Sequence, residues 1–204
     1  MPVGFVYVNE IIPDIMVDAK YYTGDNFLGR KVDGYESNTA VMTYETAIAL
    51  KAVQENLLKL NLSLVVFDAY RPQMAVDDFV NWVNDTGDVS TKEIYYPFIE
   101  KSRLIEYGYI ASLSGHSKGN TVDVSIVDLK TGKLLDMGTR FDYFGEASHY
   151  TTQSVTEEQF NNRKLLRESM MINGFSPYEN EWWHFSYQPT EYSNSDRFNF
   201  IVKY

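Results

Sequence analysis

The 204-residue chain contains no cysteine. This absence excludes disulfide bonds, thiolate metal ligands and a cysteine nucleophile. A transition-metal site in this protein would therefore have to use histidine, aspartate and glutamate side chains. Histidine is also scarce, with three residues in the whole chain, so a histidine that stands close to a carboxylate in the sequence is informative.

Long apolar runs are absent as well. The longest of note, residues 62–67, is far shorter than the ~20 residues that a membrane-spanning helix needs, so we expect no membrane partner. Residues 1–14 show no basic segment followed by an apolar run. This pattern predicts that the protein has no signal peptide and is cytoplasmic.

Positive charge is in deficit. Lysine and arginine number 18 against 28 aspartate and glutamate residues, which gives a formal net charge of −10 at pH 7. Such a chain repels nucleic-acid phosphates and anionic membranes, so we expect neither as a partner. The sequence leaves the oligomeric state open, a homo-oligomer included.

The remaining composition is that of a globular protein, with 44% hydrophobic and 23% charged residues. Its length suits one domain, which we expect to span residues 1–204. Hairpin-like strands occur beside separate helices, without a strict strand–helix–strand repeat, which predicts an α+β fold. We expect a central, mainly antiparallel sheet flanked by helices, with the active site in a cleft over the sheet.

The first half of the chain predicts two helices and a buried strand. Residues 1–40 look irregular, but their aromatic content indicates that they pack on the body of the protein. Apolar residues recur at helical spacing over residues 43–60, and Asn61 closes that helix. Residues 62–67 are typical of a buried strand. Pro72 suits the first turn of the second helix.

The second half predicts further strands and a long helix. Apolar and polar residues alternate over residues 121–127, which is typical of a half-buried strand. A hairpin turn is expected at residues 130–133. The Thr-Glu-Glu-Gln sequence at residues 156–159 is a capping box that opens a helix ending near Asn173. Residues 183–187 are expected to form the last strand.

Two short stretches carry candidate chemistry. His116 stands seven residues before Asp123, and Glu181 stands three residues before His184. Two imidazoles and one carboxylate are a common ligand set for catalytic zinc, with a fourth position left open for water. The remaining carboxylate is then free to act as a base on that water. The pattern predicts a zinc hydrolase.

The backbone has to bring these side chains together. Asp123 lies on the polar side of its strand, and Gly115 and Gly119 allow the preceding loop to fold His116 back over that strand. In a regular strand, positions three apart face opposite sides. We therefore expect Glu181 to lie in a loop or bulge just before the last strand, which would carry the second histidine.

Each of these residues also has a structural interpretation. A lone buried histidine is more often hydrogen-bonded than metal-bound, and His149, whose spacing matches no motif, is expected to serve packing. On the residues alone, Arg71 is interpreted as an ion-pair partner of Asp68, and Asp142 as a turn residue.

The combination of motifs resembles a known family. Ser-x-His-x6-Asp at residues 114–123 and Glu-x-Trp-His at residues 181–184 resemble the zinc metallopeptidases related to lysostaphin, the D-alanyl-D-alanine peptidases and the hedgehog proteins. The chain is more similar still to D-alanyl-D-alanine dipeptidases of the VanX type. That closer similarity includes residues 26–27, 32–35, 68–72, 95–97 and 137–142, and it covers nearly the whole chain.

The resemblance implies a role for each matched residue of the catalytic centre. His116, Asp123 and His184 match the ligands of a zinc ion, one per chain. Glu181 matches the general base. Arg71 matches the arginine that polarises the scissile carbonyl and stabilises the tetrahedral intermediate.

The resemblance also implies contacts with a small dipeptide substrate. Asp142 matches a carboxylate near the free amino group of the substrate. Tyr21, Tyr35 and Ser114 match positions that line the substrate pocket, and Asp68 is expected to orient the catalytic arginine.

The implied reaction is the zinc-dependent hydrolysis of D-Ala-D-Ala to two D-alanines, which depletes a cell-wall precursor. The alternatives are a D,D-carboxypeptidase or bifunctional dipeptidase/carboxypeptidase acting on peptidoglycan stem peptides, and a non-catalytic zinc-binding interaction domain. Glu181 and Arg71 argue against the interaction domain, because a binding module needs no base. The sequence does not distinguish vancomycin resistance from D-Ala-D-Ala recycling.

Overall fold

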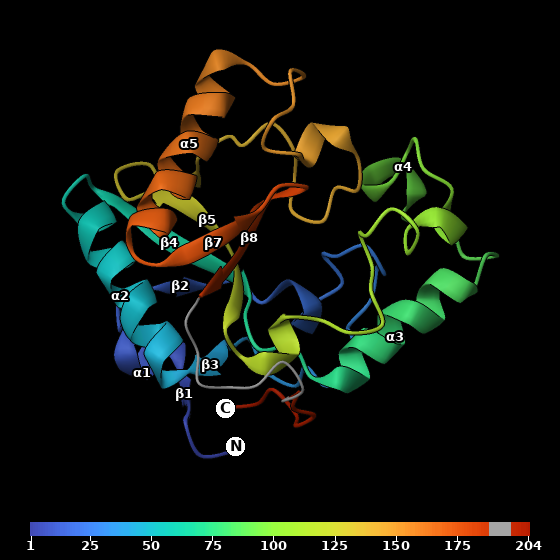
Figure 1. Cartoon of the computed structure of the whole chain (residues 1–204), viewed down its shortest axis with the longest axis horizontal. Coiled ribbons are helices and arrows are strands. Elements are labelled where there is room, and N and C mark those ends of the chain that lie inside the picture. Colours follow the sequence, from blue (N-terminus) through green and yellow to red (C-terminus); the bar gives the residue numbers. More distant parts are fainter. Residues whose placement is uncertain (188–196) are drawn as a thin grey trace.

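A six-stranded sheet with strand order β2-β4-β5-β8-β7 runs through the computed structural model, which describes residues 1–187 and 197–204, and β6 pairs with β5 (Figure 1). Strand β2 runs parallel to β4, and the other pairs in this sheet are antiparallel. Strands β1 and β3 form a separate antiparallel pair. The prediction of an α+β fold with a mainly antiparallel sheet is confirmed. The strands are β1 Phe5–Tyr7, β2 Met16–Val17, β3 Val41–Thr43, β4 Leu62–Asp68, β5 Thr121–Asp128, β6 Lys133–Leu134, β7 Phe175–Tyr178 and β8 Glu181–Tyr187.

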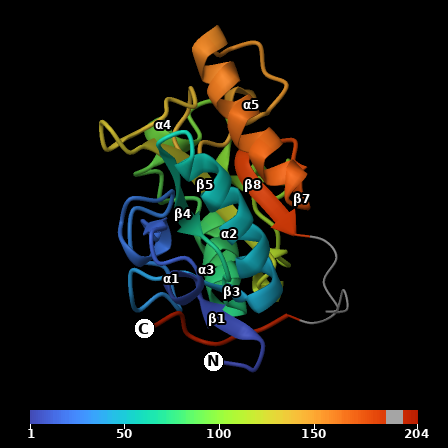
Figure 2. The same ribbon diagram turned by 90° about the vertical axis from the view of Figure 1, so that its left-hand side faces the viewer.

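Helices flank the sheet. Helices α2 and α5 pack on one side of it and contact each other, whereas α3 and α4 lie on the other side (Figure 1). Figure 2 shows the same layering from the side, with α2 in front of the strands and α3 behind them. The α-helices are α1 Val8–Ile11, α2 Tyr44–Leu58, α3 Gln73–Asn84, α4 Lys92–Tyr95 and α5 Glu157–Ile172.

Helix α2 is the helix predicted over residues 43–60. Its apolar stripe, which includes Leu50, Val53 and Leu57, is buried. Asn61 has a φ of 59°, the left-handed conformation that ends a helix and that asparagine tolerates better than most residues. The chain then enters β4, the predicted buried strand.

Helix α3 begins one residue later than expected. Pro72 has a φ of −63° and a ψ of 150°, so it is the extended residue before the helix and not part of the first turn. Its carbonyl oxygen accepts hydrogen bonds from the N–H groups of Ala75 and Val76, at 3.0 and 3.4 Å. Pro72 is thus the N-cap residue of the helix, a position where its missing N–H costs no helical hydrogen bond.

The alternating sequence of residues 121–127 predicted a half-buried strand, but strand β5 is buried on both faces. The face that carries Val122, Val124 and Ile126 is part of the hydrophobic core. On the polar face, Ser125 shares a cavity wall with loop residues 135–141, and the Thr121 hydroxyl lies 2.9 Å from that of Ser186 on the neighbouring strand β8. Protein segments, and not solvent, therefore cover the polar face of β5.

Helix α5 has the predicted capping box. Thr156 N–H donates to the Gln159 side chain at 2.8 Å, and Gln159 N–H donates to the Thr156 hydroxyl at 3.3 Å. Gly174, with a φ of 87°, turns the chain directly into β7, a strand that the sequence patterns did not predict. Pro177 within β7 weakens the strand signal.

Arg163 of helix α5 is buried without a carboxylate partner among the described residues. Its guanidinium donates to the carbonyl oxygens of Met137, Ala147 and His149, at 2.6, 2.8 and 3.0 Å. Burial lowers the pKa of Arg163 to about 10, so the side chain remains charged at neutral pH. One side chain therefore fixes both ends of loop 137–149.

The two ends of the chain pack against the loop that follows β4, and both termini lie on one side of the molecule (Figure 1). Val202 forms a parallel bridge with Tyr35, and the Phe200 ring stacks on Tyr70 with centroids 4.0 Å apart. The N–H of Gln73 donates to the carbonyl of Phe198 at 3.3 Å. Residues 198–202 thereby join the N-terminal segment to the residues around Arg71.

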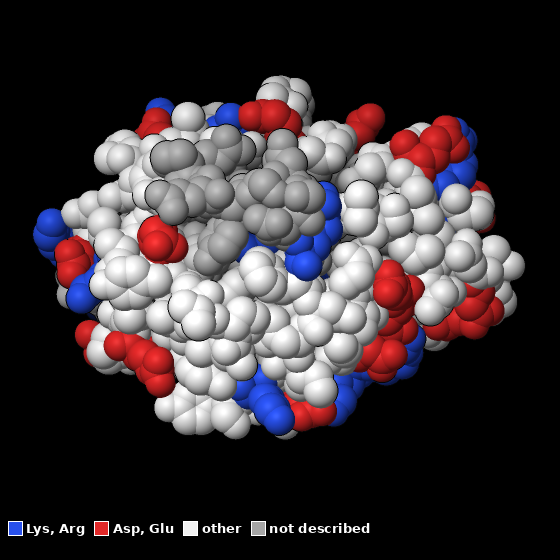
Figure 3. Space-filling view, turned by 60° about the horizontal axis from the view of Figure 1, so that its bottom comes forward, with Lys and Arg blue, Asp and Glu red and all other residues white. Residues whose placement is uncertain are grey.

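Charged side chains of both signs are interspersed on the face shown in Figure 3, and much of that face is uncharged. On this face, the acidic residues do not form one continuous patch. No helix in the described ranges combines the length and apolar character that a bilayer span requires.

We predict that Arg163→Met destabilises the protein by about 3 kcal/mol, because three buried carbonyls lose their donor. Urea unfolding followed by circular dichroism measures this change. The control is Lys164→Met, which removes the same charge from an exposed neighbouring position and should change stability by less than about 0.5 kcal/mol. Equal effects of the two substitutions would contradict the role given to Arg163.

Candidate active site

Strand register places three candidate residues in one row. Asp123 on β5 lies directly opposite Asp68 on β4 and opposite His184 on β8. Residues opposite one another on neighbouring strands project from the same face of the sheet. The register of β4 against β5 shifts between Val66 and Asp68, and this irregularity brings Asp68 opposite Asp123. Two carboxylates and an imidazole therefore meet in one row.

His116 reaches this row from the loop before β5. Gly119 has a φ of 79°, and a Cβ atom there would lie 2.3 Å from the Phe5 ring, so only glycine fits this return turn. Gly115, by contrast, has an ordinary right-handed conformation. The expectation that Gly119 folds His116 back over the strand is confirmed, and Gly115 contributes no left-handed turn.

The orientation of His116 is fixed by the backbone. Its Nδ1 lies 2.7 Å from the carbonyl oxygen of Ala69, which can only accept, so Nδ1 carries the proton. Nε2 is then left with a free lone pair that faces Asp123 and His184, at 3.4 and 3.3 Å. A hydrogen bond on the far nitrogen is the arrangement that orients histidine ligands in metal sites.

His116, Asp123 and His184 fit a divalent metal ion. Their ligand atoms all lie within 4.8 Å of one another. The Oδ1 atom of Asp123 is buried without a hydrogen bond among the described residues, although His184 Nδ1 lies 3.2 Å away. Burial opposes ionisation of Asp123, but His116 and His184 hold its pKa below the usual range. The donor set matches the nitrogen and oxygen ligands of zinc.

Glu181 belongs to β8 itself, so the expectation of a loop before the strand is wrong, whereas the bulge is present. Pro177 pairs with Phe185, but Tyr178 pairs with Glu181 where a regular ladder would bring it opposite His184. The extra residues of β8 form an irregularity that turns Glu181 toward His184, with 3.5 Å between Oε2 and Nδ1.

The environment of Glu181 favours the protonated form of its carboxyl group. Burial raises its pKa to about 7, and the charges of His184 and Arg71 partly oppose this shift. A cation bound beside it would favour the ionised form.

Arg71 projects over the same cavity. Its Nε donates to Asp68 Oδ2 at 2.9 Å, and Nη2 lies 3.5 Å from Asp123 Oδ2. The guanidinium also lies over the rings of Tyr21 and Phe79, at 5.1 and 5.0 Å from their centroids. Burial alone would lower the pKa of Arg71, but the surrounding acidic groups raise it well above its usual value, so the charge is permanent.

Asp68 is an interior support and not a cavity residue. It accepts hydrogen bonds from Arg71 and from the Tyr35 hydroxyl, the latter at 2.6 Å. Burial raises its pKa, and Arg71 and His116 oppose that shift. Tyr35 is therefore buried behind the site and is not among the residues that line the cavity, in contrast to Tyr21 and Ser114.

Asp142 is held in a strained backbone conformation with a φ of 60°. Its Oδ1 accepts a hydrogen bond from the Tyr21 hydroxyl at 3.1 Å, whereas its Oδ2 is buried with no hydrogen-bond partner among the described residues. Burial, reinforced by Asp123, raises the pKa of Asp142 well above its usual range. Arg71 opposes this shift, but no ion pair with Asp142 is formed by the residues that the structure describes.

The cavity over the row has a volume of about 330 Å³, at the small end of the range for ligand pockets. The Ser114 hydroxyl lies on its wall and accepts a hydrogen bond from His116 N–H at 3.2 Å. Eight of the ten candidate residues line the cavity, and the other two, Asp68 and Tyr35, lie behind its wall. The lining side chains with polar chemistry are Tyr21, Arg71, Tyr109, Ser114, His116, Asp123, Asp142, Tyr178, Glu181 and His184.

Two aromatic wall residues, Tyr109 and Tyr178, were not identified from the sequence. Tyr178 faces His184 with ring centroids 5.6 Å apart, and it lies on the unpredicted strand β7. Tyr109 lies in a loop between short helices, where no spacing pattern marks it. The one signal that could have indicated Tyr178 is its position just before Glu181, since the two residues pair where β7 turns into β8.

Comparison with known proteins gives a consistent result. A family model described as D-ala-D-ala dipeptidase, of the peptidase M15 type, matches residues 1–203. The D-alanyl-D-alanine dipeptidase of Enterococcus faecalis is 42% identical over 98% of this chain and 98% of its own length. The D-alanyl-D-alanine dipeptidase of Enterococcus faecium is 41% identical over the full length of both chains.

A solved structure of the vancomycin-resistance D,D-pentapeptidase VanY in complex with Zn(II) aligns with a TM-score of 0.43. Its identity is 15%, over 75% of this chain and 76% of that one. The family assignment rests on the sequence matches, which extend over the whole chain. This chain belongs to the D-ala-D-ala dipeptidase family of the M15 peptidases.

Proposed function

We propose that this chain is a zinc-dependent dipeptidase that hydrolyses D-Ala-D-Ala to two D-alanines. The observation that carries the proposal is the convergence of His116, Asp123 and His184 with Glu181 and Arg71 on one small cavity. The dipeptidase names of its full-length relatives support the substrate. In this proposal the whole chain, residues 1–204, forms one catalytic domain and acts in the cytoplasm on the free dipeptide.

The proposed ligands of one zinc ion per chain are His116, Asp123 and His184. Zinc bound there would polarise the scissile carbonyl and lower the pKa of a bound water to about 7. Ala69 holds His116 in the ligand tautomer through its carbonyl oxygen.

Glu181 is the proposed general base. Its carboxylate faces the cavity beside the ligand set, where it can take a proton from the attacking water and return it to the leaving amine. The bulge in β8 is what gives Glu181 this direction, so a local irregularity of the sheet serves the proton transfer.

Arg71 is proposed to stabilise the oxygen of the scissile carbonyl as negative charge develops there. Its guanidinium is fixed by Asp68 and by two aromatic faces, so it needs no reorganisation during the reaction. Tyr35 acts one step further back, because its hydroxyl holds the carboxylate of Asp68.

Asp142 is proposed to bind the ammonium group of the substrate, assisted by Tyr21. Its buried Oδ2 has no hydrogen-bond partner within residues 1–187 and 197–204, and an ammonium group would supply both a donor and a positive charge. Ser114 adds a hydroxyl on the cavity wall. A longer peptide would leave Asp142 without its cation, which costs several kcal/mol and so favours a free dipeptide.

We predict that zinc retention depends on His116 but not on His149. After dialysis against metal-free buffer, elemental analysis should find about one zinc ion per wild-type chain. His116→Ala should lose the metal because it removes one of three ligands. His149→Ala, which changes the third histidine of the chain outside the ligand set, should keep it. Loss of zinc in both variants would argue against the assigned ligands.

Glu181→Gln should lower kcat for D-Ala-D-Ala by about 10²–10⁴-fold, because the amide cannot take the proton. Zinc content should stay at the wild-type value, since Glu181 is not a proposed ligand. Steady-state kinetics with elemental analysis of the same samples measures both quantities. Full activity in the amide variant would eliminate Glu181 as the base.

The substrate assignment predicts a clear order of activity. Zinc-loaded protein should hydrolyse D-Ala-D-Ala, and it should act on L-Ala-L-Ala and on a pentapeptide ending in D-Ala-D-Ala at rates lower by at least about 10²-fold. Release of alanine, followed by chromatography, measures all three reactions. Comparable cleavage of the pentapeptide would replace the dipeptidase proposal with a D,D-carboxypeptidase.

A further inference from the structure

A second cavity lies next to the candidate active site. It has a volume of about 660 Å³, twice that of the site cavity, and aromatic residues form much of its wall. Its aromatic lining consists of Phe98, Tyr107, Tyr109 and Tyr143, with Glu146 and His149 as ionisable neighbours. Tyr109 is the one described residue that lines both cavities.

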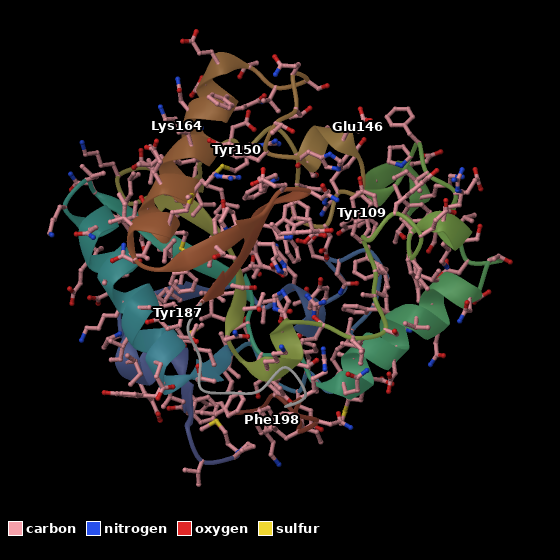
Figure 4. All side chains as sticks on the ribbon, in the orientation of Figure 1. Tyr109, Glu146, Tyr150, Lys164, Tyr187 and Phe198 are labelled. Atoms are coloured by element: carbon pink, nitrogen blue, oxygen red, sulfur yellow. The ribbon has the colours of Figure 1, made fainter. Side chains whose placement is uncertain are left out.

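The wall between the cavities is thin. Three segments, residues 107–109, 143–145 and 178–181, each contribute residues to both sides. In the first segment, for example, Gly108 faces the active site while Tyr107 faces the second cavity. Figure 4 labels Tyr109, which lies in a loop, and Glu146, which begins a short 3-10 helix.

Tyr109 is anchored in this wall at several points. Its N–H donates to the carbonyl of Leu104 at 3.0 Å, and its ring lies 5.4 Å from that of Phe144. Its hydroxyl lies at hydrogen-bond distance, 2.9 Å, from Nε2 of His149. Burial raises the pKa of this hydroxyl to about 12, so the phenol is neutral at physiological pH.

The backbone before Tyr109 sets the direction of the ring. Gly108 has a φ of 79°, which few other residues adopt, and its Cα lies close to the Tyr178 hydroxyl, since an added Cβ would be 3.4 Å from it. The loop that contains His149 is fixed in turn by Arg163, which donates a hydrogen bond to the carbonyl oxygen of His149. A fixed backbone and a fixed hydrogen-bond partner hold the ring as a rigid barrier.

We propose that Tyr109 is a specificity-determining residue that limits the side-chain size of the dipeptide substrate by closing the active-site cavity toward the second cavity. The inference rests on the proposed dipeptidase function. Removing the ring would join the two cavities and let an aromatic side chain of a D,D-dipeptide enter the second one. The free ammonium group of such a dipeptide would stay at Asp142, and its scissile carbonyl would stay beside Arg71, because both residues are unchanged.

The test compares D-Ala-D-Ala with D-Phe-D-Ala and D-Ala-D-Phe in wild type and three variants. The ratio of kcat/KM for each phenylalanine dipeptide to kcat/KM for D-Ala-D-Ala is the readout, which cancels differences in active fraction. Tyr109→Ala should raise at least one of the two ratios by about ten-fold or more. Tyr109→Leu, which preserves more of the packing, should raise the same ratio and serves if the alanine variant does not fold.

Two controls isolate the ring. Tyr109→Phe keeps the barrier and removes the hydroxyl, so both ratios should stay within about two-fold of wild type. Tyr107→Ala removes a tyrosine ring that faces only the second cavity, and it should also leave both ratios unchanged.

Unchanged ratios in Tyr109→Ala and Tyr109→Leu would overturn the proposal, as would a Tyr109→Phe variant that behaves like Tyr109→Ala. These outcomes are separable from failure of the proposed function. If wild-type protein loaded with zinc does not hydrolyse D-Ala-D-Ala at all, the dipeptidase assignment fails before any ratio is measured.

Discussion

The pairing of Asp68, Asp123 and His184 across three neighbouring strands is the constraint on which the site depends. A slip of one residue in either ladder would turn a whole strand over, exchanging core and cavity side chains. The apolar residues on the opposite face of β5, Val122, Val124 and Ile126, are buried in the hydrophobic core, so the core itself selects the correct register. Burial of the apolar face of β5 thus both stabilises the fold and aligns the proposed metal ligands on the other face.

The cavity concentrates carboxylates to an unusual degree for a buried region. Asp123, Asp142 and Glu181 line it, whereas Arg71 is the only lysine or arginine among the lining residues that the structure describes. Removing carboxylates from water is costly unless a positive charge accompanies them. Burial raises the pKa of both Asp142 and Glu181 for this reason. A divalent metal ion and a substrate ammonium group would supply the positive charge that these carboxylates require.

Much of this arrangement could be predicted from local sequence signals. Helix periodicity identified α2, the capping box identified α5, and the requirement that Glu181 and His184 meet correctly indicated a bulge. These features depend on residues close together in the chain.

Features that depend on distant partners could not be derived in this way. The burial of both faces of β5 depends on loops from elsewhere in the chain, and β7 is concealed by its proline. Tyr35 resembled a pocket residue, but its partner is Asp68, and Tyr109 gains its position only from Leu104, Phe144 and His149. The contact of residues 200–202 with the loop around Arg71 has a consequence for folding. Because Val202 bridges Tyr35 and Phe200 stacks on Tyr70, the support behind Arg71 joins segments that lie far apart in the chain. Contacts between distant segments carry a large loop-closure cost, so we expect this support to form late in folding, after the sheet is in place.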